Sequence, residues 1–265
     1  MAVECKLKVH RAVLQKVGFF HFGADHSTPV QALKCALKDA SDVKGALIVL
    51  PEAFNISVYY YSNTGDRNFD PSVLDKVADL AKEFGVAFVA GLIIQECCGP
   101  QPPCSGAYLI ESTQQTLMCY KVIPDDSTKG TSFQNYTPCQ GTSDFNNPID
   151  YEGIRIGALI CADANPPKIP LQCMLEYTNS MYKRVNSVVK ACNVMCVPAH
   201  MAKNSFTTGE VGDNTDVPKT LILANSRTNG LPSFITDPNG IIVKRAVCCS
   251  GNEIVALRLD DLSRA

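Results

Sequence analysis

The chain has 265 residues, of which 46% are hydrophobic and 19% are charged. Its formal net charge is -2 and its isoelectric point is about 6.1, so no overall charge attracts it to nucleic acid or to an anionic membrane surface. The composition excludes an intrinsically disordered chain, and a chain of this length can bury a large core without disulfides or a structural metal.

Short apolar runs alternate with amphipathic helical patterns in the first part of the chain. Strands are predicted over residues 17–22, 46–50 and 86–94, and the unbroken apolar sequence of the last two is typical of strands buried on both faces. Helices are predicted over residues 28–40 and 72–84, where apolar residues recur at intervals of three and four. Two consecutive strand–helix–strand units imply parallel strands with helices packed against the sheet.

The middle of the chain has a different pattern. A hairpin is predicted from residues 106–113 and 115–122, and the polar segment 124–151 is long enough to be a functional loop. The strand–helix pattern then resumes with a strand at 154–160, a helix at 171–190 and strands at 194–197, 221–224, 233–236, 241–247 and 253–259. Because no change of composition marks a boundary, we expect residues 1–265 to form a single domain.

Thirteen cysteines are the unusual feature of the composition. Their odd number and wide scatter, and an N-terminal sequence without an apolar signal-peptide core, favour thiols in a reducing compartment, so a cytoplasmic location is expected. A zinc or redox protein is the alternative, but the sequence contains no C-x-x-C motif, and we expect no metal. No apolar run reaches the roughly 20 residues that cross a bilayer, so no membrane association is expected.

Three polar residues stand where predicted strands end. Glu52, Lys121 and Cys161 each follow such a run, and in open α/β sheets the carboxyl ends of strands form the crevice that binds ligands. Taken singly, these residues could equally be a solvated carboxylate, a surface lysine and a buried thiol. Together they supply what a covalent amide or nitrile hydrolase needs: a nucleophile, a general base and a group that stabilises an oxyanion.

The sequence around these residues is similar to that of a known superfamily. Segments 50–54 (LPEAF), 120–124 (YKVIP) and 157–163 (GALICAD) resemble the carbon–nitrogen hydrolase (nitrilase) superfamily, which uses a Glu-Lys-Cys triad in this chain order. The resemblance implies an α-β-β-α sandwich with two mixed sheets flanked by helices, assembled as a homodimer or higher homo-oligomer. It further implies hydrolysis of a non-peptide C–N bond without a metal or organic cofactor.

Some positions depart from the pattern of the superfamily and bear on the substrate. Ala162 stands where an aromatic residue is common, and Asp163 resembles the amidase-type branch, which favours amides over nitriles. Gln134 occupies the place of a further Glu, and an amide side chain cannot share a proton as a carboxylate does. Lys168 stands where an acidic residue is common.

Further residues could line the substrate pocket. Tyr60 lies shortly after Glu52, His200 follows the predicted strand 194–197, and Arg227 follows the strand 221–224. An arginine there could bind a substrate carboxylate through two hydrogen bonds. Packing, a structural histidine and a surface salt bridge are the respective structural alternatives.

These observations predict an amidase-type hydrolase that acts on a small amide, ω-amide or N-carbamoyl compound through a thioester on Cys161. The alternative function is a catalytically weak member of the superfamily that binds a metabolite or a partner, and the departures at Ala162, Gln134 and Lys168 motivate it.

Overall fold

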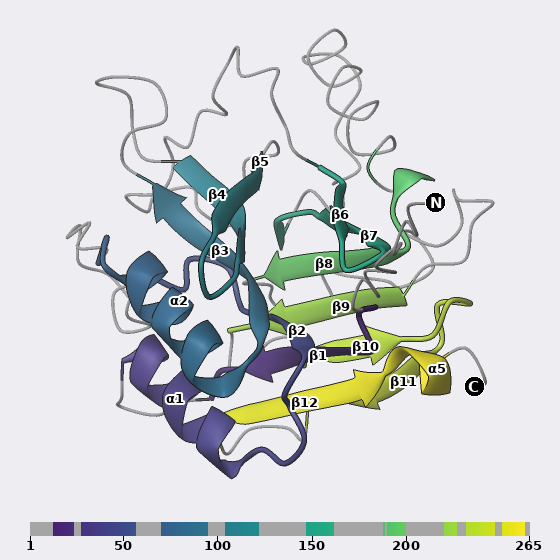
Figure 1. The fold of residues 1–265 in the computed structure, drawn as a ribbon, viewed down its shortest axis with the longest axis horizontal. Helices are drawn as coiled ribbons and strands as arrows, with labels where there is room; N and C mark the ends of the chain where they lie inside the picture. The colour runs from purple at the N-terminus through teal and green to yellow at the C-terminus, as the bar shows by residue number, and fades with distance from the viewer. Residues whose placement is uncertain are drawn as a thin grey trace, which may run out of the picture.

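A computed structural model describes most of the regular elements of the chain. The described residues are 13–23, 28–56, 70–94, 104–121, 147–161, 188, 190–199, 220–226, 232–246 and 251–262. Within them, twelve strands form two six-stranded sheets (Figure 1).

The first sheet has the strand order β12-β1-β2-β3-β4-β5. Its strands are β1 (Lys16–His21), β2 (Ala46–Val49), β3 (Ala87–Ile94), β4 (Cys104–Ile110), β5 (Gln115–Tyr120) and β12 (Glu253–Arg258). β1, β2 and β3 run parallel, whereas β12 pairs antiparallel with β1, and β4 and β5 extend the other edge as an antiparallel hairpin. The sheet is therefore mixed, and its parallel centre is the one predicted from the strand–helix–strand pattern.

The second sheet repeats this plan, with the order β11-β10-β9-β8-β7-β6. Its strands are β6 (Ile149–Tyr151), β7 (Ile154–Ala158), β8 (Val194–Ala199), β9 (Thr220–Asn225), β10 (Phe234–Thr236) and β11 (Ile242–Arg245). β7, β8 and β9 are parallel, and antiparallel strands complete both edges.

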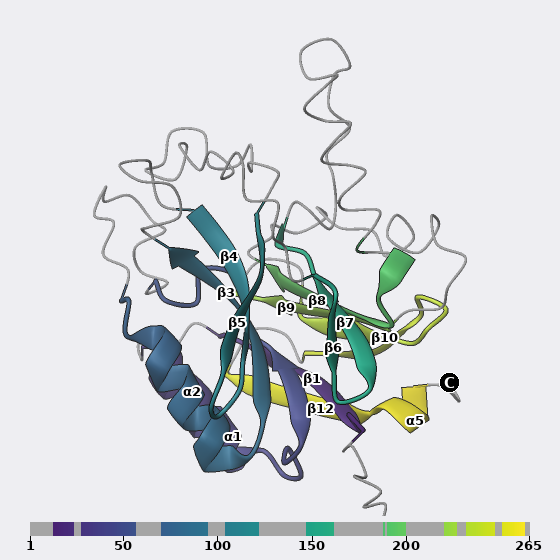
Figure 2. The same cartoon turned by 45° about the horizontal axis from the view of Figure 1, so that its top comes forward.

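Two helices, α1 (Pro29–Asp39) and α2 (Val73–Phe84), cover the outer face of the first sheet (Figures 1 and 2). α1 begins at Thr28, whose side-chain oxygen accepts a hydrogen bond from the N–H of Gln31, and this cap satisfies a donor that the helix itself cannot. α2 ends at Gly85, which adopts a φ of 64° and so closes the helix in the left-handed conformation. A short helix, α5 (Leu259–Leu262), follows β12.

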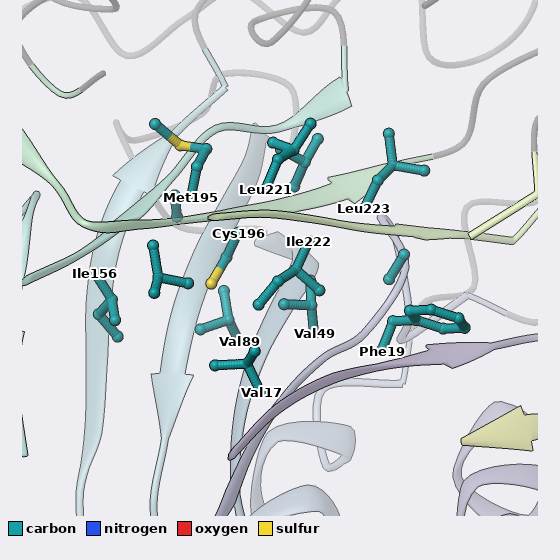
Figure 3. Packing of buried hydrophobic residues seen from close by; sticks show 14 of the residues in the cluster. Val17, Phe19, Val49, Val89, Ile156, Met195, Cys196, Leu221, Ile222 and Leu223 are labelled. Atoms are coloured by element: carbon teal, nitrogen blue, oxygen red, sulfur yellow. The ribbon is translucent and has the colours of Figure 1, made fainter. Parts of the chain in front are cut away.

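The main core lies between the two sheets. Figure 3 shows Cys196 and Ile222 of the second sheet pointing toward Val49 and Val89 of the first, and all four side chains are fully buried. A polar contact also joins the sheets, because His21 Nδ1 lies 3.0 Å from Ser233 Oγ. A second core fills the space between the first sheet and its two helices.

Among the described residues, the predicted elements agree closely with those observed, with two differences. The short helix α5 begins at Leu259, where the sequence predicts the end of a strand. The polar segment 124–151 was predicted to be loop throughout, but its last three residues form β6, which pairs with β7. Most of this segment and of the predicted helix 171–190 lies outside the described residues. No helix in the described ranges is long and apolar enough to span a membrane.

Candidate active site

Glu52 lies in the turn that follows β2, and this turn is bonded to both sheets. The N–H of Glu52 donates to the carbonyl of Ala199 at the end of β8 (3.3 Å), and the N–H of Phe54 donates to the carbonyl of Gly91 on β3 (2.9 Å). Gly91 permits this close approach, because a Cβ at position 91 would lie 2.9 Å from Glu52 Cα. The backbone of Glu52 is thus held between the two sheets.

Lys121 follows β5 and forms an ion pair with Glu52. Lys121 Nζ donates to Glu52 Oε1 at 2.7 Å, and the two side chains are only 11% and 9% exposed. Removing one partner of such a buried pair leaves an uncompensated charge, which costs about 3–5 kcal/mol. The structure therefore brings together two of the residues that the sequence places at strand ends.

Cys161 comes three residues after β7 and is 2% exposed. Its φ is 48°, in the left-handed region that residues other than glycine seldom adopt. The segment leading to it is anchored to the neighbouring strand, because the N–H of Leu159 donates to the carbonyl of Cys196 (3.0 Å). Strained backbone of this kind is concentrated at functional sites, which singles out Cys161 among the cysteines with a described backbone.

A hydrogen bond joins the strand that leads to Lys121 with the strand that leads to Cys161. Cys119, two residues before Lys121, donates from its thiol to the carbonyl of Ala158 (3.4 Å), three residues before Cys161. The side chain of Asn147 also binds Ala158, donating to its carbonyl (2.8 Å) and accepting from its N–H (3.0 Å). The ends of β5 and β7 therefore meet at the edge where Glu52 lies.

The six predicted substrate-binding residues all lie outside the described residues, so their roles stay predictions: Tyr60, Gln134, Ala162, Asp163, His200 and Arg227. Lys168 lies outside as well. Within the described ranges, no three His, Cys, Asp or Glu side chains group together as a metal site would require.

Sequence reasoning missed several residues that shape this site. Gly91 and Asn147 act through contacts between distant segments, and no local pattern indicates such contacts. Ser105 lies one residue before the predicted hairpin, and the N–H of Lys121 donates to its carbonyl (2.8 Å). A register shift between Ala107 and Tyr108 sets this pairing, and no local pattern indicates that shift.

The arrangement places a carboxylate, an ammonium group and a thiol at the same edge of the sandwich. The carboxylate can accept a proton from a thiol or a water molecule, and the ammonium group can stabilise negative charge on an oxygen. Burial strengthens both interactions, because little solvent screens them. Such a site suits nucleophilic attack on a carbonyl carbon.

Comparison with known families agrees with this chemistry. A sequence profile for the carbon-nitrogen hydrolase family matches residues 21–261, which is most of the chain. The chain belongs to this family. Among curated proteins, no sequence matches this carbon-nitrogen hydrolase.

Solved structures share the fold of this carbon-nitrogen hydrolase at low sequence identity. One of them is a mutant of the amidase from Nesterenkonia sp. AN1, with the acetamide moiety of fluoroacetamide on its active site cysteine. It superposes with a TM-score of 0.62 at 18% identity, over 96% of this chain and 94% of that one. Another mutant of the same amidase, of the nitrilase superfamily, gives a TM-score of 0.63 at 16% identity, over 96% and 95% of the two chains. Nit3 of Saccharomyces cerevisiae, a member of branch 10 of the nitrilase superfamily, gives a TM-score of 0.60 at 17% identity, over 92% and 90%. The two mixed sheets with helices are thus the nitrilase-type α/β sandwich.

Proposed function

We propose that this carbon-nitrogen hydrolase cleaves the C–N bond of a small amide, ω-amide or N-carbamoyl compound, with Cys161 as the nucleophile. The observation that carries the proposal is the buried ion pair between Glu52 and Lys121, 2.7 Å long, at the edge of the sandwich where β7 leads to Cys161. The positive φ of Cys161 supports the assignment of this residue as the nucleophile.

In the first half of the reaction, Cys161 Sγ attacks the amide carbonyl carbon while Glu52 takes the thiol proton. The carbonyl oxygen gains negative charge in the tetrahedral intermediate, and Lys121 Nζ stabilises it. Glu52 then gives its proton to the leaving nitrogen, the C–N bond breaks, and ammonia or an amine departs from a thioester.

In the second half, a water molecule attacks the thioester carbon while Glu52 accepts its proton. The C–S bond of the second tetrahedral intermediate breaks, and Cys161 recovers its proton from Glu52. One carboxylic acid and one ammonia or amine are produced for each amide and water consumed, so no metal or organic cofactor enters the balance.

The amide class has independent support from the structural neighbours. In a mutant of the Nesterenkonia amidase, the active site cysteine carries the acetamide moiety of fluoroacetamide. This adduct keeps its amide group, so it supports an amide placed beside a nucleophilic cysteine, and the thioester step rests on the hydroxylamine test. At 18% identity this supports the class of substrate and leaves its remaining structure to experiment.

The test uses hydroxylamine, which traps a thioester as a hydroxamate. The wild-type protein incubated with hydroxylamine and a panel of small amides, ω-amides and N-carbamoyl compounds should form hydroxamate, and Cys161→Ala should form none. Cys35→Ala is the matched control, because Cys35 is an exposed thiol in α1, and it should keep wild-type rates. Equal hydroxamate formation by the wild type and Cys161→Ala would remove Cys161 from the mechanism.

Three further parts of the proposal concern the whole protein. We propose that residues 1–265 act as one catalytic unit, because the core between the sheets contains residues from Leu14 to Leu262. We also propose a homodimer or higher homo-oligomer, on the resemblance to the superfamily, and a cytoplasmic location, on the odd number and wide scatter of the thirteen cysteines. Light scattering during size-exclusion chromatography should then give at least twice the chain mass of 28.7 kDa, and a monomer mass would refute the assembly.

A further inference from the structure

Ser105 carries a buried hydroxyl with no hydrogen-bond partner among the described residues. It lies near the start of β4 and is 2% exposed, and within the described part of the chain its Oγ makes no hydrogen bond. Folded proteins seldom leave a buried polar atom unsatisfied, because the group has lost its bonds to water without gaining others. A partner that is not part of the fold would explain this hydroxyl.

The side chain of Ser105 faces the space between the sheets, on the same side as Lys121. Ala107, two residues further along β4, belongs to the core between the sheets and pairs with Cys119, whose thiol reaches across to the second sheet. The backbone bond from Lys121 to the carbonyl of Ser105 continues this register, so Ser105 and Lys121 are opposite each other. Side chains directly opposite in an antiparallel pair lie on one face, with Cβ atoms about 5 Å apart.

The hydroxyl therefore adds a neutral acceptor and donor beside the charged pair of Glu52 and Lys121. Lys121 Nζ donates to Glu52 and does not use Ser105 Oγ, although the two side chains stand opposite each other. A ligand with its own N–H group would supply the missing partner.

We propose that the Ser105 hydroxyl binds the amide nitrogen of the substrate, its oxygen accepting a hydrogen bond from an N–H. The inference rests on the proposed function, in which an amide is attacked by Cys161. In this arrangement Lys121 stabilises the charge on the carbonyl oxygen. Ser105 binds the amide nitrogen, so that the nitrogen faces the Glu52 carboxyl group that protonates it. A substrate that lacks N–H, such as an ester, cannot donate a hydrogen bond to this hydroxyl, so Ser105 favours amides.

A matched pair of alkylating reagents tests this without requiring turnover. Iodoacetamide and methyl iodoacetate both alkylate a thiol at a carbon next to a carbonyl group, but only iodoacetamide carries N–H donors. The rate of labelling of Cys161, followed by mass spectrometry, should fall about five- to tenfold in Ser105→Ala with iodoacetamide, which is the loss of one hydrogen bond. With methyl iodoacetate the rates should agree within about twofold.

Thermal unfolding separates this role from a structural one. Because Ser105→Ala removes an unsatisfied hydroxyl, its Tm should equal or exceed that of the wild type. Ser233→Ala is the control, since Ser233 Oγ accepts from the N–H of Asn225 (2.9 Å) and contacts His21. Its Tm should fall, and its ratio of labelling rates for the two reagents should stay that of the wild type.

Each outcome decides between the two proposals. Equal loss of labelling with both reagents, no loss with iodoacetamide, or no labelling of wild-type Cys161 by iodoacetamide would overturn the role of Ser105. If Cys161 forms hydroxamate but Ser105→Ala keeps the wild-type rate with iodoacetamide, the proposed function is supported and the role of Ser105 is refuted. A selective loss in a protein that turns over no amide would support Ser105 as an amide-binding residue and refute the hydrolase mechanism.

Discussion

Substituting alanine for Gly91 should displace the turn that carries Glu52. A Cβ added at position 91 would lie 2.8 Å from Pro198 Cβ and 2.9 Å from Glu52 Cα, whereas carbon atoms in contact are separated by about 3.5 Å or more. A proline ring and a backbone atom cannot rotate away, so the turn or β8 must move by roughly half an ångström. Because Glu52 is also bonded to Ala199 on β8, this displacement reaches the ion pair with Lys121.

We expect Gly91→Ala to lose about 1–3 kcal/mol of unfolding free energy, as overpacked sites do. Its kcat/KM for amide-dependent hydroxamate formation should fall about tenfold, because displacements of the order of 1 Å can reduce rates a hundredfold. Urea unfolding and steady-state kinetics measure the two effects. Gly251→Ala is the matched control, since a Cβ there meets no atom within 4 Å, and it should keep both values.

A wild-type kcat/KM in Gly91→Ala would refute the displacement of Glu52, because the backbone of Glu52 would then tolerate the clash. Equal losses in Gly251→Ala would refute it as well, because the effect would then follow from any glycine replacement and not from the contact with Glu52.

Three other substitutions test the site and parts of the sandwich away from it. Asn147→Ala removes both side-chain hydrogen bonds to Ala158. We expect urea unfolding to show a loss of about 1–3 kcal/mol of unfolding free energy and hydroxamate assays to show a lower kcat. An unchanged kcat would show that these two bonds do not position the end of β7 for catalysis. Burial lowers the pKa of His21 below its ordinary 6.5; the unfolded chain then binds the proton first as the pH falls, and stability declines from pH 7 to pH 5. His21→Gln should show a smaller decline in urea midpoints over that range, and an equal decline would contradict the assignment. Burial, and to a lesser extent the charge of Glu152, raises the pKa of Glu111, so ionised Glu111 disfavours the fold at neutral pH. Glu111→Gln should therefore raise the Tm at pH 7, and this gain should disappear toward pH 4. A gain in Tm that stays constant with pH would point to a cause other than ionisation.

The regular elements could be predicted from the sequence because each carries its own local signal. Strands β2 and β3 have unbroken apolar runs, and α2 has a glycine directly after its last residue. β6 lacks such a signal, since Ile149 and Tyr151 are only partly buried and Asp150 is exposed, and the strand gains its order from pairing with β7. Short edge strands of this kind depend on a neighbour that the local sequence does not reveal.

The contact between Glu52 and Lys121 could be anticipated for a geometric reason. β2 and β5 run in the same direction within one sheet, so residues that follow them emerge at one edge. The supports of this pair could not be anticipated, because they depend on where the second sheet lies. Gly91 is needed only because Pro198 of β8 approaches it, and Asn147 acts only because Ala158 is beside it.

The proposed catalytic residues are divided between the two sheets, so the packing between the sheets affects the distances between them. Glu52 and Lys121 follow strands of the first sheet, whereas Cys161 follows β7 of the second. Their relative position is therefore set by the packing between the sheets, where side chains such as Val89 and Cys196 meet (Figure 3). Protein interiors are packed as densely as organic crystals, so a change of volume there moves one sheet relative to the other. The core between the sheets is consequently where packing most directly controls the distance between the proposed nucleophile and its base.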